Sequence, residues 1–568
     1  MTQNRRTIMH RIGLTFLVLL GTVATLEAAA PKKVLNACKS LASVITYGRD
    51  GKLISTSMAF SVGDKGEAVS EYAAFNNARS AECVSETGGK QKVMRINGAS
   101  DIYDVIKFSM ESKPKESLTV AKTVCRQGTA VYILRKGSAK KPEAVECKIS
   151  ARKDVPGGIY YELSLPYDEK NVGCPVVNEN GECVAVVQRN VGKDATTYAI
   201  SASFCDNLKV RETDYGNSAL NSVLIPKALP EGENAAYTYV YMLSQIKHDN
   251  DVYFAALQDF LTAYPNNADG YTERAKYYAS QDKFKECEAD IANAVSLSDK
   301  KDNPHYVLSR LVYQSALYNS AKAAPAGWTL EKSASEAQEA YNVNPLPLYQ
   351  LQLGDCYFGM KKYQEAVNMY SAVNASPIAT PETYFYEAKA RGKVDSLDAK
   401  IIVLLDTAIS RFSKPYNSSV APYIFERANQ YNNMGKYRES ALDYIEYEHI
   451  VGFQNLNDNF YYIREQIALK GKMYKQADDD INRALAINPN DYVYNAEKAA
   501  LMLRFGMFED AVHSAQRAIK IDPQATDGYR LLGIAYGEMK KKQLCLQNLQ
   551  KAKDLGDDRA DELIKQYK

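Results

Sequence analysis

The sequence predicts a multidomain chain in which an all-β domain is followed by an all-α array of helical repeats. From about 33 to 205, short apolar runs alternate with Gly, Asn and Asp turns, which is typical of an antiparallel barrel or sandwich. After 232, apolar residues recur at helical spacing, and the last three units repeat at a spacing of 34 residues. The length of 568 residues also exceeds that of one ordinary domain.

The charges of the chain are nearly balanced. The 70 Lys and Arg residues face 68 Asp and Glu residues, so the net charge is +2. This balance gives no reason to expect nucleic acid or an anionic membrane as the main ligand. Tyrosine is abundant, at 41 residues against 16 Phe and 1 Trp. Tyrosines can fill the seams between helices, or alternatively line a groove that binds peptides.

Residues 1–30 are typical of an export signal. Three arginines at 5, 6 and 11 precede an apolar run over 12–26, and small residues follow at 28–30. The run is too short to span a membrane comfortably, and no later segment has eighteen uninterrupted apolar residues. We therefore expect an exported protein, periplasmic, secreted or on the surface of a bacterial envelope, with no transmembrane segment in its mature part.

Seven of the ten cysteines lie before residue 206. In an oxidising compartment some of them could pair, but no CxxC motif supports a redox or zinc site. We favour buried structural thiols. The Leu35–Cys38 segment is similar to a lipoprotein cleavage box, but Lys32 and Lys33 separate it from the apolar run. Lipidation of Cys38 is therefore the less favoured alternative.

The helical part repeats most clearly at its end. Small residues fall in register at 34-residue spacing, namely Ala477, Ala511 and Cys545, and then Ala484, Ala518 and Ala552. We expect them where paired helices cross closely. Pro489 and Pro523 are also in register and should end the second helices, because proline lacks the amide that a continuing helix needs.

The last unit resembles the tetratricopeptide repeat. Tyr529, Leu532, Gly533 and Tyr536 match its pattern of an aromatic residue, Leu-Gly and then Tyr. Similar units lie upstream, such as Leu353-Gly354 with Tyr357. The resemblance covers about 330 residues and implies a superhelix of roughly eight or nine helical pairs over 232–556. A capping helix should follow at 557–568, and the segment 206–231 is typical of a linker.

Three segments of the first domain resemble trypsin-like serine proteases of the bacterial Deg (HtrA) type. They are the strand 57–62 leading into 68–78, the segment 98–106, and the segment 171–182 with its Asn-x-Gly-x-Pro run and Asn-Gly hairpin. The resemblance implies a trypsin-like double barrel over 33–205. The positions that match the catalytic His, Asp and Ser are Ala73, Asp104 and Val172.

The barrel sequence lacks the residues for this chemistry. A serine nucleophile needs an imidazole to take its proton. The five histidines are at 10, 248, 305, 449 and 513, so none lies within 33–205. We therefore expect a degenerate protease domain. Two alternatives are less favoured: Cys174 could act as a displaced nucleophile with Lys170 as its base, or His248 could fold back to complete a site.

No metal or cofactor site is predicted. The sequence contains no HExxH, GxxxxGK[ST] or Asp-rich calcium loop, and no GxGxxG after a strand. The acidic run Asp478–Asp480 and the basic run Lys540–Lys542 are interpreted as solvated helix ends.

The resemblance to tetratricopeptide proteins implies a scaffold or adaptor that binds a protein or peptide partner. The first helix of each pair should line a concave surface. By repeat register, the last units would present there Asn459, Tyr462, Gln466, Val493, Ala496, Arg504, Asp527 and Arg530. Two other functions stay open, a divergent peptidase with an unorthodox cysteine nucleophile and a carbohydrate-binding surface protein with tyrosine platforms.

Overall fold

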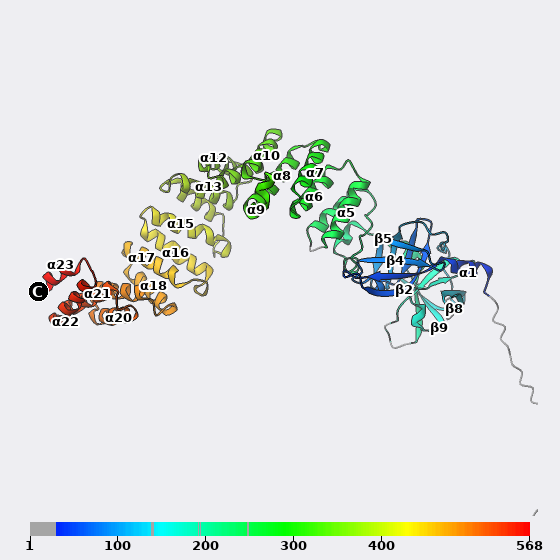
Figure 1. Ribbon diagram of the computed structural model, residues 1–568, viewed down its shortest axis with the longest axis horizontal. Helices are drawn as coiled ribbons and strands as arrows, with labels where there is room; N and C mark the ends of the chain where they lie inside the picture. The colour runs from blue at the N-terminus through cyan, green and yellow to red at the C-terminus, as the bar shows by residue number, and fades with distance from the viewer. Residues whose placement is uncertain (1–29, 138–140, 191, 193–194, 247–248) are drawn as a thin grey trace, which may run out of the picture. The chain divides into compact units, whose positions relative to one another are not determined.

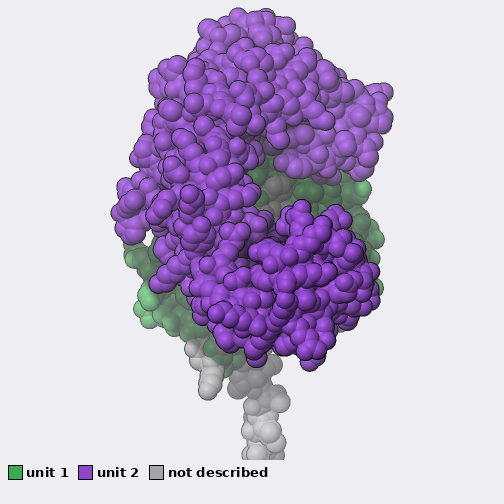
Figure 2. Space-filling model, turned by 90° about the vertical axis from the view of Figure 1, so that its left-hand side faces the viewer, with its two compact units in different colours: residues 1–274 green, residues 275–568 purple. Residues whose placement is uncertain are grey.

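The computed structural model describes residues 30–137, 141–190, 192, 195–246 and 249–568. Contacts within the chain divide it into two compact units, 1–274 and 275–568, which are coloured separately in Figure 2. The predicted export signal lies outside the described residues except for Ala30, and so does His248. Among the described residues, none of the helices combines the length and the apolar character needed to cross a membrane.

Unit 1 contains two closed antiparallel barrels, each built from six of the described strands. The strand order is β1-β2-β3-β6-β5-β4 in the first barrel and, in the same pattern, β7-β8-β9-β12-β11-β10 in the second. The strands are β1 Leu41–Tyr47, β2 Leu53–Val62, β3 Glu67–Ser70, β4 Ser80–Ser85, β5 Lys90–Ser100, β6 Val105–Met110, β7 Ala130–Lys136, β8 Pro142–Val155, β9 Gly158–Pro166, β10 Pro175–Val177, β11 Cys183–Val187 and β12 Thr196–Ser201. This repeated order is that of a trypsin-like double barrel, which confirms the predicted fold class.

The hairpin predicted at Asn180-Gly181 connects β10 and β11. The side-chain oxygen of Asn178 accepts hydrogen bonds from the backbone N–H groups of Asn180 and Glu182, both at 3.0 Å. Gly181 has φ +79°, a conformation that favours glycine. All five residues of β11 are buried, which explains its continuous apolar sequence.

The segment 206–231 packs against the first barrel and is not a free linker. The N–H of Ile96 donates to the carbonyl of Pro226, and the N–H of Ala228 donates to the carbonyl of Ile96, both at 2.9 Å. Lys227, between them, is only 5% exposed. Sequence alone shows the prolines and polar residues of this segment but not the strand edge whose backbone groups it satisfies.

The first long helical pair is also held to the first barrel within unit 1. Helix α5 Asn250–Ala263 carries Asp259, whose two carboxylate oxygens accept from Nε and Nη2 of Arg95 at 2.5 and 2.6 Å. Near its start, Asp251 pairs with Arg79 at 2.7 Å. The compact unit therefore extends beyond the predicted domain boundary at residue 231 and includes α4 Glu233–Ser244.

The rest of the chain consists of helical pairs joined by short turns (Figure 1). The remaining α-helices are α1 Lys32–Ala37, α2 Ala202–Asp206, α3 Ser218–Asn221, α6 Ala268–Ser280, α7 Phe284–Leu297, α8 Asp302–Tyr318, α9 Ser320–Ala323, α10 Leu330–Val343, α11 Pro347–Gly359, α12 Tyr363–Asn374, α13 Pro381–Val394, α14 Lys400–Ser410, α15 Ala421–Asn433, α16 Tyr437–Val451, α17 Asp458–Lys470, α18 Tyr474–Ile487, α19 Tyr492–Arg504, α20 Phe508–Ile521, α21 Thr526–Glu538, α22 Lys542–Asp554 and α23 Ala560–Tyr567.

The repeat signals have the structural roles that the sequence predicts. The six small residues in register are all fully buried between paired helices. Pro489 and Pro523 follow the ends of α18 and α20 at Ile487 and Ile521. Gly533 allows the helices of the last pair to approach, since a Cβ there would lie 2.7 Å from Leu549. The residues of the basic run Lys540–Lys542 are exposed at the turn between α21 and α22.

All ten cysteines are described, and each is a buried free thiol. Cys38 packs with Val34 and Leu41 in the barrel core, where burial raises the pKa of its thiol to about 11. A lipid on this sulfur would have to leave the core, so the structure gives the lipidation alternative no support.

Candidate functional site

The segments that match the protease triad lie together in unit 1, beside a cleft that Val172 lines. Ala73 begins the 3-10 turn η2 (Ala73–Phe75), and its N–H donates to Oδ1 of Asp104 at 2.8 Å. Val172 follows the turn η3 (Glu169–Asn171). At the next residue, Gly173, a Cβ would lie 3.4 Å from the backbone nitrogen of Glu71. The structure therefore brings all three segments together, as the resemblance implied.

The cleft has a volume of about 400 Å³. Its described lining is mostly polar and includes no histidine, consisting of Ser43, Ser55, Thr56, Ser57, Met58, Glu71, Glu169, Lys170, Val172 and Arg189.

Arg189 occupies the centre of the charged groups in this cleft. Its guanidinium donates to Glu71 at 2.6 Å and to Glu169 at 2.7 Å. Its Nε also lies 3.8 Å from Oδ2 of Asp104. Glu71 is buried and accepts a further hydrogen bond from Ser57. The residue that compensates the acid at the triad position is thus an arginine, which stays protonated at any physiological pH and cannot act as a base.

Asp104 carries one carboxylate oxygen that is not hydrogen-bonded within the described chain. This oxygen, Oδ2, is buried without a hydrogen-bond donor, while Oδ1 accepts from Ala73. Burial, opposed by the Ala73 hydrogen bond, raises the pKa of Asp104 to about 6. The negative charge of Glu71 acts in the same direction, and the charge of Arg189 acts against it.

The backbone amides beside Val172 are engaged within their own turn. In serine proteases of this class, the N–H groups of the nucleophile and of the residue two positions earlier bind the oxyanion. Here the N–H of Val172 donates to the carbonyl of Glu169 at 3.1 Å. The N–H of Lys170 donates to Oδ1 of Asp168 at 3.0 Å. Neither amide therefore points freely into the cleft.

Cys174 is completely buried beneath this turn. Its Sγ donates to the carbonyl of Lys170 at 3.6 Å, a backbone contact and not one with the lysine side chain. Burial raises the pKa of this thiol to about 12, far from the value that a nucleophilic thiolate requires.

The predicted partner-binding residues of the last repeats differ in their availability. Asn459 and Arg504 are exposed, while Tyr462, Gln466, Val493 and Asp527 are half-buried. Ala496 is only 5% exposed, because the close crossing of helices leaves small residues inside. Arg530 forms an ion pair with Asp557, so its charge is already compensated within the chain.

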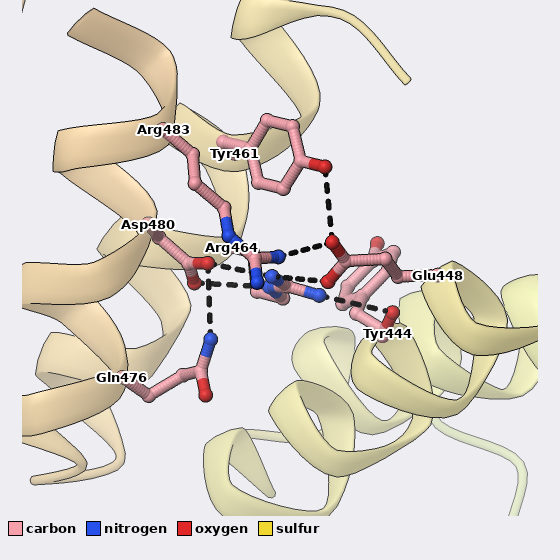
Figure 3. A network of polar contacts seen from close by, with 7 residues as sticks. All are labelled: Tyr444, Glu448, Tyr461, Arg464, Gln476, Asp480 and Arg483. Atoms are coloured by element: carbon pink, nitrogen blue, oxygen red, sulfur yellow. Dashed lines mark hydrogen bonds and ion pairs between the residues drawn. The ribbon is translucent and has the colours of Figure 1, made fainter. Parts of the chain in front are cut away.

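One of the residues interpreted as solvated instead belongs to a buried network that is centred on Arg464 (Figure 3). Asp480 is fully buried and accepts from Nε and Nη2 of Arg464 at 2.9 and 2.6 Å. Arg464 also pairs with Glu448 at 2.8 Å, and Glu448 accepts from Tyr461 at 3.0 Å. This corrects the solvated interpretation for Asp480, whereas Asp479 is exposed as expected. An acidic residue near a helix start can face a buried arginine as well as water.

The same pairing occurs one repeat earlier. Arg427 of α15 donates to both carboxylate oxygens of Asp443 in α16, at 2.7 Å each. Arg464 of α17 and Asp480 of α18 each lie 37 residues further on. The two ion pairs therefore hold equivalent helical pairs together.

Several of the tyrosines serve this helical packing. Tyr370 donates its hydroxyl to Asp355 at 2.8 Å, Tyr444 donates to Asn429 at 2.5 Å, and Tyr349 donates to Asp302 at 2.8 Å. Each of these rings is buried between helices while the hydroxyl reaches a polar group of another helix.

Fold and sequence together define a class, a protein in which a trypsin-like double barrel precedes tetratricopeptide-type helical pairs. No family model matches the chain. Over 98 residues it is 32% identical to the small glutamine-rich tetratricopeptide repeat-containing protein 2 of Saccharomyces cerevisiae and 31% identical to that of Mycosarcoma maydis. These matches cover 17% of this chain and 28% and 27% of the relatives, so the chain spans little more than a quarter of their length.

Solved protease structures resemble the barrel part. The Rv3671c protease of M. tuberculosis H37Rv, in its inactive form, is 13% identical with a TM-score of 0.26, over 32% of this chain and 95% of that one. The serine endoprotease of Yersinia pestis is 15% identical with a TM-score of 0.27, over 31% and 62%. At these values the assignment of the double barrel rests on its strand order and not on the matches.

Proposed function

We propose that this protein is an exported, non-catalytic scaffold that binds protein or peptide partners through its helical repeats. Its double barrel would be a protease fold without peptidase chemistry. The observation that carries this proposal is that Arg189 pairs with Glu71 and lies near Asp104, at the place where a protease would have its catalytic imidazole. An arginine cannot accept the proton of a nucleophile, whereas an imidazole can.

Two further features support the loss of catalysis. The amides of Lys170 and Val172 are hydrogen-bonded within their turn, so an oxyanion would find no prepared donors there. The sulfur of Cys174 is buried with a strongly raised pKa, which disfavours the alternative of a cysteine nucleophile.

The helical part supports a binding role. In stacked helical pairs, the first helices line the concave surface, which is called the inner face below. Side chains of the first helices that point away from the packed core are available there to a partner. Asn459 and Arg504 are exposed in this way on α17 and α19. Export remains part of the proposal on the evidence of residues 1–30, and fractionation of the producing cells with detection of the processed chain would test it.

The absence of catalysis is tested by incubating the purified chain at pH 7.5 separately with casein, with a fluorophosphonate probe and with iodoacetamide. We expect no cleavage and no labelling of the native barrel. A Cys174→Ser variant serves as the matched control. Saturable labelling that disappears in this variant, together with casein cleavage that also disappears, would establish a peptidase and refute the proposal.

Partner binding is tested by site-specific photocrosslinking. The photoreactive residue benzoylphenylalanine replaces Tyr462 on α17 in one variant and Lys520, an exposed residue near the end of α20, in the control. Both variants are irradiated with the envelope proteins of the producing cells. We expect a discrete adduct from position 462 that is absent at 520. Equal, diffuse labelling at both positions would contradict the proposal that the first helices of the pairs form a binding surface.

A further inference from the structure

The half-buried carboxylate of Asp355 in unit 2 lies close to tyrosine rings from neighbouring helices. Asp355 lies on α11, nine positions after the N-cap residue Leu346. Gln466, one of the residues predicted to face a partner, lies nine positions after the N-cap residue Asn457 of α17. Asp355 and Gln466 therefore occupy equivalent positions in their repeats, and both are expected on the inner face.

Ring packing around Asp355 is made possible by a glycine. The hydroxyl of Tyr370 in α12 donates to Oδ1 of Asp355 at 2.8 Å. A Cβ at Gly354 would lie 2.6 Å from the Tyr370 ring, so only glycine lets the ring reach this position. The ring centroid of Tyr386 in α13 lies 5.8 Å from that of Tyr370, and Tyr386 is 38% exposed.

A third ring comes from α8. Tyr313 is half-buried and packs against the cluster that contains Leu353 and Cys356, the neighbours of Asp355 on α11. Burial, and next the negative charge of Asp355, raises the pKa of the hydroxyl groups of Tyr313, Tyr370 and Tyr386. Three rings from three helices therefore lie in the field of one carboxylate.

A cation of the chain itself already lies near this group. The guanidinium of Arg310, an exposed residue of α8, lies 5.9 Å from the ring centroid of Tyr306. Its charge lowers the pKa of Asp355, whereas burial, the largest effect, raises it to about 6. Among the causes that set the pKa of Asp355, the charge of Arg310 is smaller than burial and the hydrogen bond from Tyr370, so Arg310 compensates the carboxylate only in part.

We propose that Asp355, held in place by the buried Tyr370, binds a lysine or arginine side chain of a polypeptide on the inner helical face, together with the half-buried ring of Tyr313 and the exposed ring of Tyr386. Ring faces carry negative potential and attract cations, and a carboxylate among them adds direct charge complementarity. The tyrosine hydroxyls are neutral donors that leave the net negative charge in place. The site deepens the proposed partner-binding function and rests on it.

The test begins with a selection from a phage-displayed library of random dodecapeptides against the full-length chain and, in parallel, against Asp355→Asn. We expect the wild type to enrich peptides with a basic residue at one fixed position, and the variant to lose this preference. The best peptide is then titrated by fluorescence anisotropy. Replacing its basic residue with acetyl-lysine or citrulline should weaken binding about tenfold.

Variants of the protein distinguish the ring faces from general effects of mutation. Tyr386→Leu should weaken binding of the selected peptide more than Tyr386→Phe, because phenylalanine keeps the ring. Arg310→Ala should strengthen it, since a competing cation is removed. Binding of the wild type should weaken from pH 7.5 to pH 5 as Asp355 is protonated. Circular dichroism of each variant establishes that the helices are folded.

The outcomes separate this site from the proposed function. Selected peptides without a shared basic position, or peptides that bind Asp355→Asn as well as wild type, would overturn the cation site and leave the scaffold function standing. A free N-terminal amine as the essential cation would also overturn it. Recovery of no binding peptide would count against both the site and peptide binding by the repeats.

Discussion

Asp104, beside the barrel cleft, and Asp355, on the inner helical face, are both half-buried, and the pKa of each is raised to about 6, but the surroundings of the two carboxylates differ. Asp104 lies near Arg189, which also binds Glu71 and Glu169. Asp355 is bound by the neutral hydroxyl of Tyr370 and lies among rings. In the first region the chain compensates its own charges. In the second, the remaining negative charge is left for a partner.

The largest effect on stability is expected at a buried ion pair whose charges compensate one another. Arg464 is 1% exposed at its side chain and pairs with Asp480 and Glu448. Arg464→Met should lower the free energy of unfolding by about 3–5 kcal/mol, because the buried Asp480 loses its cation and Glu448 keeps only Arg483. The measurement is urea denaturation followed by helical circular dichroism.

The equivalent pair one repeat earlier is the matched control for this variant. Arg427 has a side chain that is 21% exposed, and its partner Asp443 is 12% exposed. Water can therefore replace part of the lost interaction, and Arg427→Met should cost only about 1 kcal/mol. Equal losses in both variants would contradict the view that burial of the pair sets its contribution.

A smaller loss is expected in the barrel cleft. Arg189→Met removes the cation between Glu71, Asp104 and Glu169, of which Glu71 has a side chain only 9% exposed. We expect a destabilisation of about 2–3 kcal/mol, seen as a lower temperature of barrel unfolding in near-ultraviolet circular dichroism. The variant should still not cleave casein. Unchanged stability would mean that Arg189 does not hold the cleft together.

The pH dependence of the barrel separates Asp104 from the other acids. Its pKa in the folded state is about 6, above the usual value of an unfolded aspartate. The folded state therefore binds more protons than the unfolded state between about pH 4 and 6, and stability from this group falls as pH rises through that window. Asp104→Asn should remove this fall. The free energy of unfolding of the variant minus that of wild type should therefore be about 1–2 kcal/mol larger at pH 7 than at pH 4. A parallel pH profile in both chains would refute this assignment.

Much of the architecture is predictable because its signals are local. The buried small residues of the last repeats and the Asn178–Glu182 turn depend on neighbours in sequence, so periodicity and turn chemistry are sufficient to find them. The order of a double barrel followed by helical pairs can therefore be predicted from sequence. The docked segment 206–231 was not, because its partner strand lies more than 100 residues away.

The charged contacts of the sites are less predictable. Glu71 and Arg189 are 118 residues apart, and no spacing rule connects them. Asp480 belongs to an acidic run that looks solvated, and only the three-dimensional position of Arg464 explains its burial. Likewise, Ala496 has the register of a surface residue but lies inside a close helix crossing. Sequence patterns indicate the face of an element, whereas the compensation of charge depends on contacts between elements.

The smallest effect is expected for a single hydroxyl. Tyr370 lies 15 residues after its acceptor Asp355, and Tyr444 lies 15 residues after its neutral acceptor Asn429. Tyr370→Phe should cost about 1 kcal/mol at pH 8 and less at pH 5, because a hydroxyl bonds more strongly to an ionised carboxylate. Tyr444→Phe should cost a similar or smaller amount, with no dependence on pH over this range. If the two variants show the same pH profile in urea denaturation, Asp355 is not ionised at pH 8, and the contrast between the helical site and the barrel cleft would lose its electrostatic basis.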